Sequence, residues 1–268
     1  MPKTPKPMCE KPNKNEPELV TEELRLESIA KDSWYKRTVN VATIEHSFEV
    51  FKPYLHGQEY LELGPAEGIM TLLLTQVATR LTVVDGASTF CSELKLRFPG
   101  VEVVNAMFEE YKPDRQFDNI ILGHVLEHVL DPVLLLRSAG SWLTPNGRIF
   151  AAVPNARSIH RQAAVMMGLL PSEDALNEAD VHHGHRRVFS PESFRCAFYQ
   201  AGLEIENFGG YWLKPISNRQ IEESWSASML KAFMRLGERY PDIAAEIYVI
   251  GRQKPIEGTD ARAAKATC

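Results

Sequence analysis

Short runs of apolar, β-branched residues alternate with amphipathic segments over the central part of the chain. These runs predict strands at residues 58–63, 81–84, 101–104, 117–122 and 148–153, and the segments between them predict helices at 70–78, 88–98 and 132–143. Asp131 and Pro132 are typical of a helix start, and residues 145–147 (Pro-Asn-Gly) predict a turn into the fifth strand. Strands that alternate with helices of about ten residues predict a parallel sheet with helices on both faces.

The pattern changes after residue 190. Ser190, Pro191 and Glu192 are typical of a helix start, and Gly202 ends that helix after Ala201. The sequence predicts strands at 203–208 and 244–250, separated by a helical insertion over 218–240. We expect these last two strands to form an antiparallel pair at the edge of the sheet.

Composition places the chain among globular proteins. It has 268 residues, of which 44% are hydrophobic and 24% charged, and this balance excludes a wholly disordered protein. Residues 1–18 hold five prolines and four lysines. We therefore expect disordered tails at 1–18 and 255–268, around a single domain at 19–254.

The charge balance and the cysteine content limit which partners and which cellular compartment we expect. The 30 Lys and Arg residues against 35 Asp and Glu give a net charge of −5, which argues against nucleic-acid binding as the main activity. No apolar run reaches the roughly 18 residues of a membrane helix, and the first residues lack the apolar core of a secretory signal. The cysteines form no CxxC pair, so we expect reduced thiols and a cytoplasmic protein; they are Cys9, Cys91, Cys196 and Cys268.

A glycine-containing turn follows the first predicted strand, in the sequence LELGPAEG at 61–68. A turn that joins a strand to a helix presents backbone N–H groups, which bind phosphates or carboxylates. Asp85 ends the next strand, 21 residues after Gly64, at the spacing where a carboxylate accepts hydrogen bonds from ribose hydroxyls. The dinucleotide pattern GxGxxG is absent, so the sequence predicts a ligand that contains adenosine without being a dinucleotide.

The ordered series LELGPAEG, VVDGA, FDNIILGHVLEHVLDP and LTPNGRIFAAVPN resembles the class I S-adenosylmethionine-dependent methyltransferase superfamily, in its small-molecule type. The resemblance covers roughly residues 58–208. It implies an α/β fold with a Rossmann-like, doubly wound, mostly parallel seven-stranded sheet and an antiparallel edge hairpin. It also implies an N-terminal helical lid, at residues 19–57.

The resemblance assigns the S-adenosylmethionine contacts residue by residue. Glu62, Gly64 and Gly68 would hold the methionine end, with Ala66 in place of the family's middle glycine, a residue type that resists positive φ. Asp85 would bind the ribose. The remaining expected cofactor contacts are Gly86, Ala106, Met107, Phe108 and His124, and Asn105 stands where the family often has Asp.

His124, Glu127 and His128 form an HxxEH pattern directly after the fourth strand. A zinc-protease interpretation is disfavoured because the pattern lies at a strand end among nucleotide-binding elements. Quinone-biosynthesis O-methyltransferases look similar here, carry ExxEH and can bind a divalent cation. Since His124 replaces the first Glu of that pattern, we predict no metal.

A second histidine-rich run supplies a candidate catalytic base and a candidate substrate contact, and aromatic residues elsewhere supply further substrate contacts. His185 lies in HRRVFSPE, which is similar to an H-x-R-x-F-S-P-E segment of the family, and imidazole is a natural general base. The candidate bases are His185, His124 and His128. Arg186 could bind a substrate anion, and aromatic substrate contacts are expected from Trp34, Tyr35, Tyr211 and Trp212.

Three functions remain open from the sequence. The first is an O- or N-methyltransferase that acts on a small metabolite, either a sugar or a specialised-metabolite precursor. The second is a cyclase or lyase that forms methylthioadenosine by attack of the cofactor's amine on its own aminobutyl carbon. The third is a non-catalytic protein that binds an adenosyl ligand. We expect a small-molecule substrate and no membrane or nucleic-acid partner, and a homodimer stays open.

Overall fold

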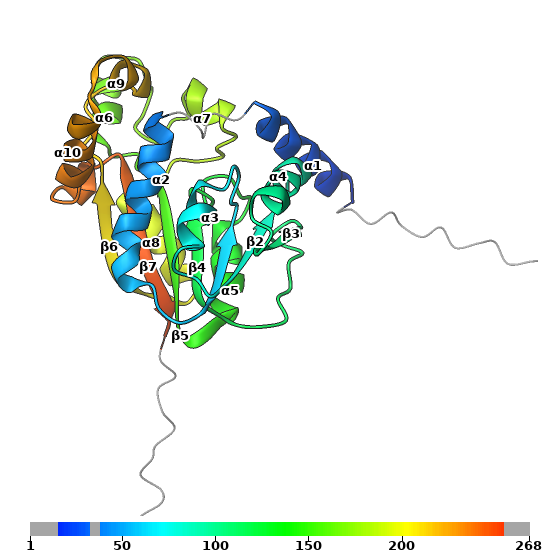
Figure 1. Cartoon of the computed structure of the whole chain (residues 1–268). Coiled ribbons are helices and arrows are strands. Elements are labelled where there is room, and N and C mark those ends of the chain that lie inside the picture. Colours follow the sequence, from blue (N-terminus) through cyan, green and yellow to red (C-terminus); the bar gives the residue numbers. More distant parts are fainter. Residues whose placement is uncertain (1–15, 33–37, 255–268) are drawn as a thin grey trace, which may run out of the picture.

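A seven-stranded sheet forms the centre of the protein in a computed structural model, which describes residues 16–32 and 38–254 (Figure 1). The strand order is β3-β2-β1-β4-β5-β7-β6, and only β7 runs antiparallel to its two neighbours. This arrangement confirms the predicted fold class, including the antiparallel edge pair. The strands are β1 (Glu59–Leu63), β2 (Arg80–Asp85), β3 (Glu102–Asn105), β4 (Phe117–Gly123), β5 (Leu143–Pro154), β6 (Leu203–Tyr211) and β7 (Glu246–Gln253).

Helices cover both faces of the sheet because its central strands are apolar on both sides. One apolar core contains Phe48 and Leu74 and lies under α2, α3 and α4. The other contains Leu136 and Phe194 and lies under α5 and α8. The helix bounds are α1 (Glu16–Lys31), α2 (Thr38–Phe51), α3 (Ile69–Leu74), α4 (Ser88–Arg97), α5 (Pro132–Ser141), α6 (Ile159–Met166), α7 (Glu178–His182), α8 (Pro191–Gln200), α9 (Asn218–Ser224) and α10 (Ala227–Gly237).

Local sequence signals explain where several helices begin. Asp131 is the N-cap of α5 and accepts a hydrogen bond from Leu134 N, as the sequence predicted. Ser190 caps α8 through a reciprocal pair of hydrogen bonds with Ser193. Two helices, α9 and α10, lie in the stretch where a helical insertion was expected. No helix of the described residues has both the length and the apolar character that crossing a bilayer requires.

Two predicted boundaries differ most from the structure. β5 begins at Leu143, so the turn expected at 145–147 lies inside the strand. The register with β4 shifts after the Phe117–Leu143 pair, which lets β5 absorb those residues as an irregularity. α3 ends at Leu74 rather than at Ala78, because the chain turns there to reach the start of β2.

The first helix, α1, packs on the start of α4 at the end of the sheet where the parallel strands finish (Figure 1). Glu27 accepts hydrogen bonds from Ser88 N at 2.5 Å and from Thr89 Oγ1 at 2.5 Å. α1 begins at Glu16, so residues 16–18, which we had assigned to a tail, are helical. The rest of that tail, at 1–15, and the tail expected at 255–268 lie outside the described residues.

Candidate functional site

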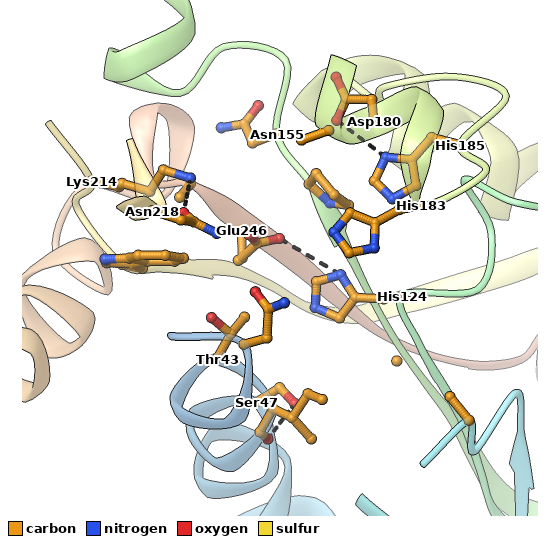
Figure 2. Close-up of a pocket in the computed structure, with 18 of the residues that line it drawn as sticks. Thr43, Ser47, His124, Asn155, Asp180, His183, His185, Lys214, Asn218 and Glu246 are labelled. Carbon is orange, nitrogen blue, oxygen red and sulfur yellow. Dashed lines mark hydrogen bonds and ion pairs between the residues drawn. The ribbon is translucent and has the colours of Figure 1, made fainter. Parts of the chain in front are cut away.

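A pocket of about 440 Å³ opens where β1, β4 and β5 end (Figure 2). Its walls come from α2, from the bend after β1 and the start of α3, from the carboxyl ends of β4 and β5, and from the start of β7. The remaining walls come from α6, from α7 and the residues on either side of it, and from α9 with the segment before it. In an open parallel sheet, ligands bind at this edge, beside the strands where the chain direction of the connections reverses. β1 and β4 are those two strands here.

The bend after β1 lines one end of the pocket. Glu62 is buried and accepts a hydrogen bond from Thr71 Oγ1 at 2.6 Å. Gly64 and Gly68 adopt φ of +67° and +73°, and Ala66 adopts φ of +45°. An L-residue pays a conformational penalty in this region, so Ala66 keeps the backbone shape of a glycine-rich bend under local strain.

Asp85 lies directly against this bend, as its spacing from Gly64 predicted. Its two carboxylate oxygens accept hydrogen bonds from Ala66 N at 3.3 Å and from Ala87 N at 2.8 Å. Burial raises the pKa of Asp85 to about 6, although both hydrogen bonds oppose that rise. Burial likewise raises the pKa of Glu62 to about 8, against the hydrogen bond from Thr71. Two buried carboxyl groups therefore flank the bend.

The residues expected to surround the adenine gather beside Asp85. Ala106 N donates to Asp85 O at 3.1 Å, and the Phe108 ring lies close to Gly64. A Cβ on Gly86 would lie 2.9 Å from Met107 Sδ and 2.7 Å from Leu26 Cδ1 of α1. Within the described part of the chain, none of the residues expected around the ribose and adenine lines the pocket.

His124 occupies the centre of the pocket between two buried carboxylates. It follows β4 with φ of +58°, and its backbone N donates to Ala152 O at 2.9 Å. Its Nδ1 lies 3.4 Å from Glu127 Oε1 and 3.9 Å from Glu246 Oε2. Burial opposes the charged imidazolium, but these two carboxylates raise the pKa of His124 to about 8. His124 therefore carries a proton at neutral pH.

His185 belongs to a second carboxylate–imidazole pair on another wall. Its Nδ1 lies 3.2 Å from Asp180 Oδ1. Asp180 also receives hydrogen bonds from Arg161 Nη1 at 3.0 Å and from Asn177 N at 2.9 Å. Burial would raise the pKa of Asp180, but these partners hold it at about 2. Asp180 is thus a fixed negative charge that orients the His185 ring.

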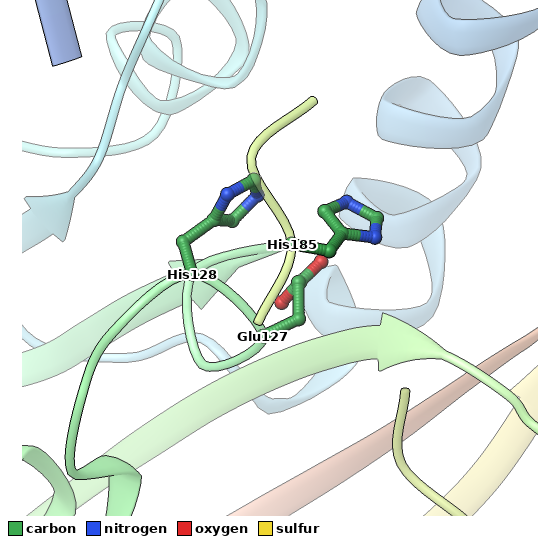
Figure 3. Close-up of side chains that lie close together, drawn as sticks. All are labelled: Glu127, His128 and His185. Carbon is green, nitrogen blue, oxygen red and sulfur yellow. The ribbon is translucent and has the colours of Figure 1, made fainter. Parts of the chain in front are cut away.

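Glu127 and His128 lie close to His185 of the pocket wall (Figure 3). One ligand atom from each falls within 4.8 Å of the others, and neither Glu127 Oε2 nor His128 Nε2 has a hydrogen-bond partner among the described residues. Burial lowers the pKa of His128 to about 4, so its imidazole is neutral. A carboxylate with two imidazoles suits a divalent transition metal, so these residues could hold one although the sequence predicted none.

The residues expected to bind substrate have different positions. Trp212, at φ of +68°, lines the pocket. Tyr211 is fully buried beside His46, with ring centroids 5.3 Å apart, and is not part of the described wall. Arg186 donates a hydrogen bond to His128 O at 2.8 Å and forms an ion pair with Glu22 of α1 at 2.7 Å. Its guanidinium is therefore held by α1 and by the segment that contains His128. Trp34 and Tyr35 lie outside the described residues.

Glu246 and Lys214 are among the charged residues of the pocket wall that the sequence analysis missed. Glu246 interrupts the otherwise apolar run AAEIYVI, and a buried carboxylate in such a run is a signal that could have found it. Lys214 had no such signal. Its Nζ donates to Asn218 Oδ1 at 2.7 Å and lies 4.7 Å from the Trp212 ring centre.

Comparison with known proteins gives consistent matches. The family model described as "Methyltransferase domain" matches residues 14–207. A ubiquinone biosynthesis O-methyltransferase of Xanthomonas euvesicatoria is 25% identical over 173 residues, which are 62% of this chain and 70% of that protein.

Solved structures share the fold. The N-methyltransferase NodS of Bradyrhizobium japonicum, in complex with S-adenosylhomocysteine, has a TM-score of 0.56 and 14% identity, over 88% of this chain and 98% of that one. A methyltransferase of Thermotoga maritima, described as a possible histamine N-methyltransferase, has a TM-score of 0.57 and 18% identity, over 88% and 96% of the two chains.

Proposed function

Because the chain belongs to the class I S-adenosylmethionine-dependent methyltransferases, we propose that it transfers the cofactor's methyl group to an oxygen or nitrogen atom of a small metabolite. The observation that carries this proposal is the continuity of the pocket. The same cavity is lined by the bend that would hold the methionine end, at Glu62 and Ala66, and by two carboxylate-paired histidines, His124 and His185. A sugar or a specialised-metabolite precursor remains our proposed acceptor class.

The cofactor would lie with its methionine end at the bend and its ribose at Asp85. Glu62 is placed to accept hydrogen bonds from the ammonium group, and the backbone N–H groups of the bend can bind the carboxylate. This orientation directs the sulfonium methyl toward His124 and the rest of the pocket. Adenosine would then meet Gly86 and Met107 beneath α1, so Leu26 of α1 would lie beside the base.

The reaction is an in-line displacement at the methyl carbon. A lone pair of the acceptor atom forms the new bond to carbon while the carbon–sulfur bond breaks, and sulfur keeps that electron pair as S-adenosylhomocysteine. The acceptor's proton moves to the general base. Holding the nucleophile, the carbon and the sulfur in line supplies several kcal/mol of the rate enhancement.

His185 is the histidine best placed to take that proton. Asp180 lies against Nδ1, which leaves Nε2 as the nitrogen that can accept a proton. His124 is clamped by two carboxylates and already protonated, so it is suited to donate a hydrogen bond to the acceptor. His128 is neutral but does not line the described pocket, and it contacts His185 edge-on with ring centroids 4.8 Å apart.

A divalent cation is a second candidate for activating the acceptor. Glu127, His128 and His185 would hold it, and such a cation would act as a Lewis acid that lowers the pKa of an acceptor hydroxyl. Activity that is lost on dialysis against a chelator and restored by one cation would assign this role. Activity that a chelator leaves unchanged would leave His185 as the base.

The experiment that tests the proposed function measures the fate of the cofactor. Purified protein is incubated with S-adenosylmethionine and a panel of hydroxylated and aminated metabolites, and the products are identified by mass spectrometry. S-adenosylhomocysteine with an acceptor heavier by one methylene unit supports methyl transfer. Methylthioadenosine without acceptor methylation would instead favour the cyclase or lyase, although the two carboxylate-paired histidines of the pocket wall support an external acceptor.

Matched variants assign the base. His185→Gln is expected to lower kcat by roughly 10²–10⁴-fold while affinity for S-adenosylhomocysteine is retained. His56→Gln is the control, because the His56 side chain hydrogen-bonds to the Asn146 carbonyl and does not line the pocket. Unchanged kcat in His185→Gln would refute the assignment of the base.

A further inference from the structure

Lys214 places a positive charge in the pocket wall with little to balance it. The side chain is partly buried, its ammonium lies over the Trp212 ring, and its one hydrogen bond goes to the neutral amide of Asn218. No carboxylate of the described residues comes within ion-pair distance of it. An ammonium group has three N–H donors, so Lys214 retains donors for a ligand.

The carboxylates nearest to Lys214 are already engaged by other cations. Asp180 is held by Arg161 and by His185, at 3.0 and 3.2 Å. Glu246 lies 3.9 Å from the imidazole of His124. These carboxylates act on Lys214 only at longer range, so its charge has no carboxylate in contact with it among residues 16–32 and 38–254.

Lys214 and the proposed base lie on opposite sides of the same cavity. Figure 2 shows Lys214 and Asn218 on one side, His185, His183 and His124 on the other, and Glu246 between them. An acceptor that offers its reacting atom to His185 can therefore extend its other end to Lys214.

The charge of the cofactor favours the same kind of acceptor. S-adenosylmethionine brings a sulfonium, an ammonium and a carboxylate into the pocket, and because Glu62 and the bend would bind the last two, the sulfonium is the charge that faces the acceptor. A second cation in the cavity would meet both this charge and Lys214 at low dielectric. An anion would instead be attracted by both.

We propose that the acceptor carries an anionic oxygen group, a carboxylate or a phosphate, and that Lys214 binds this group and so selects anionic acceptors. This inference rests on the proposed function for the direction of the acceptor, but the anion site itself can be measured without turnover. Lys214 is a specificity-determining residue in this proposal. Because phosphate and carboxylate share the oxyanion chemistry that an ammonium group binds, the experiment uses both.

The binding test uses protein saturated with S-adenosylhomocysteine. Inorganic phosphate and acetate are titrated while chemical shifts of pocket histidines are followed by NMR. Lys214→Met is expected to weaken binding of the preferred anion by at least tenfold, and Lys214→Arg is expected to retain it. Lys95→Met, on the exposed side of α4, is the matched control and should bind as the wild-type protein does.

The turnover test compares acceptors that differ only in charge, such as 4-hydroxybenzoate with 4-hydroxybenzyl alcohol and glycerol 3-phosphate with glycerol. We expect the anionic member of a methylated pair to have the higher kcat/KM, and Lys214→Met to raise its KM while kcat changes less. Equal anion binding by the wild type and Lys214→Met would overturn the proposal, as would a preference for neutral acceptors that Lys214→Met leaves unchanged.

These outcomes separate the two proposals. Anion binding that depends on Lys214, in a protein that methylates no acceptor, would support the anion site and count against the proposed function. Methylation of neutral acceptors alone would support the function and refute the anion site. Retained affinity for S-adenosylhomocysteine shows that each variant is folded, and Lys214→Gln replaces Lys214→Met should the latter lose it.

Discussion

Glu62 offers a quantitative test of where the cofactor's amino group binds. The carboxyl group is 3% exposed, and burial raises its pKa to about 8, with the negative charge of Asp85 adding to the rise and Thr71 opposing it. At pH 7, a group with that pKa holds its proton in about nine molecules out of ten. The ligand-free protein therefore presents a neutral carboxylic acid at the bend.

An ammonium group bound against Glu62 stabilises its ionised form, so binding must release the proton. Removing it at pH 7 costs about 1.4 kcal/mol, or a factor of about ten in affinity. The direction of the pH dependence of binding follows from the raised pKa of Glu62 in the ligand-free protein. Affinity is lowest at acidic pH, rises by up to tenfold per pH unit toward pH 8, and levels off above it as Glu62 ionises without the ligand.

Isothermal titration with S-adenosylhomocysteine, in buffers of different ionisation enthalpy, measures the protons released. We expect about 0.9 proton per ligand from Glu62 at pH 7 and almost none from this position in Glu62→Gln. The ligand's own amine contributes equally to both proteins, so the difference between them isolates Glu62. Glu93→Gln, on the exposed face of α4, is the control. Equal proton release by the wild type and Glu62→Gln would refute the placement of the amino group.

Substitutions at three positions test other parts of the structure. Ala66→Val puts a β-branched residue at φ of +45° and should lower the free energy of unfolding by about 2 kcal/mol, or Tm by roughly 4–8 °C. Ala66→Gly should melt no lower than the wild type. Equal Tm values for the two variants would contradict the strain at Ala66. Asp180→Asn should lower kcat by about 10²-fold or more without loss of S-adenosylhomocysteine binding, and steady-state kinetics that show unchanged kcat would remove Asp180 from the mechanism. Gly184→Ala should weaken the packing of α1, because the new Cβ would lie 2.4 Å from Ile29 Cδ1. Backbone hydrogen exchange in α1 should then be faster than in the wild type. Exchange as slow as in the wild type would contradict this contact.

The sequence predicted the cofactor bend well because its geometry is local. The spacing between Gly64 and Asp85 spans one strand–helix–strand unit, whose length fixes where the second carboxylate arrives. The cap at Asp131 was equally predictable, since it depends on residues within one turn of the helix. The positive φ of Ala66 followed from its place in a pattern that normally carries glycine.

The acceptor side of the pocket could not be predicted in the same way. Lys214 and Glu246 reach the pocket because β7 returns antiparallel between β5 and β6, and no local pattern encodes that placement. The left-handed conformations of His124 and Trp212 arise from the surrounding packing, since neither sequence position signals a turn. The commitment of Arg186 to Glu22 depends on how α1 docks, which connects segments far apart in the chain.

The pocket is lined both by α2, the helix that precedes the first strand, and by β7, the last strand of the fold, through Thr43 and Glu246. Neither an amino-terminal nor a carboxyl-terminal fragment can assemble both walls, so ligand recognition requires the sheet to be closed to its final strand. Occupancy should therefore oppose global unfolding rather than local opening, by about 2.7 kcal/mol when the free ligand is a hundred times its Kd. A ligand for this pocket would serve as a reporter of complete folding.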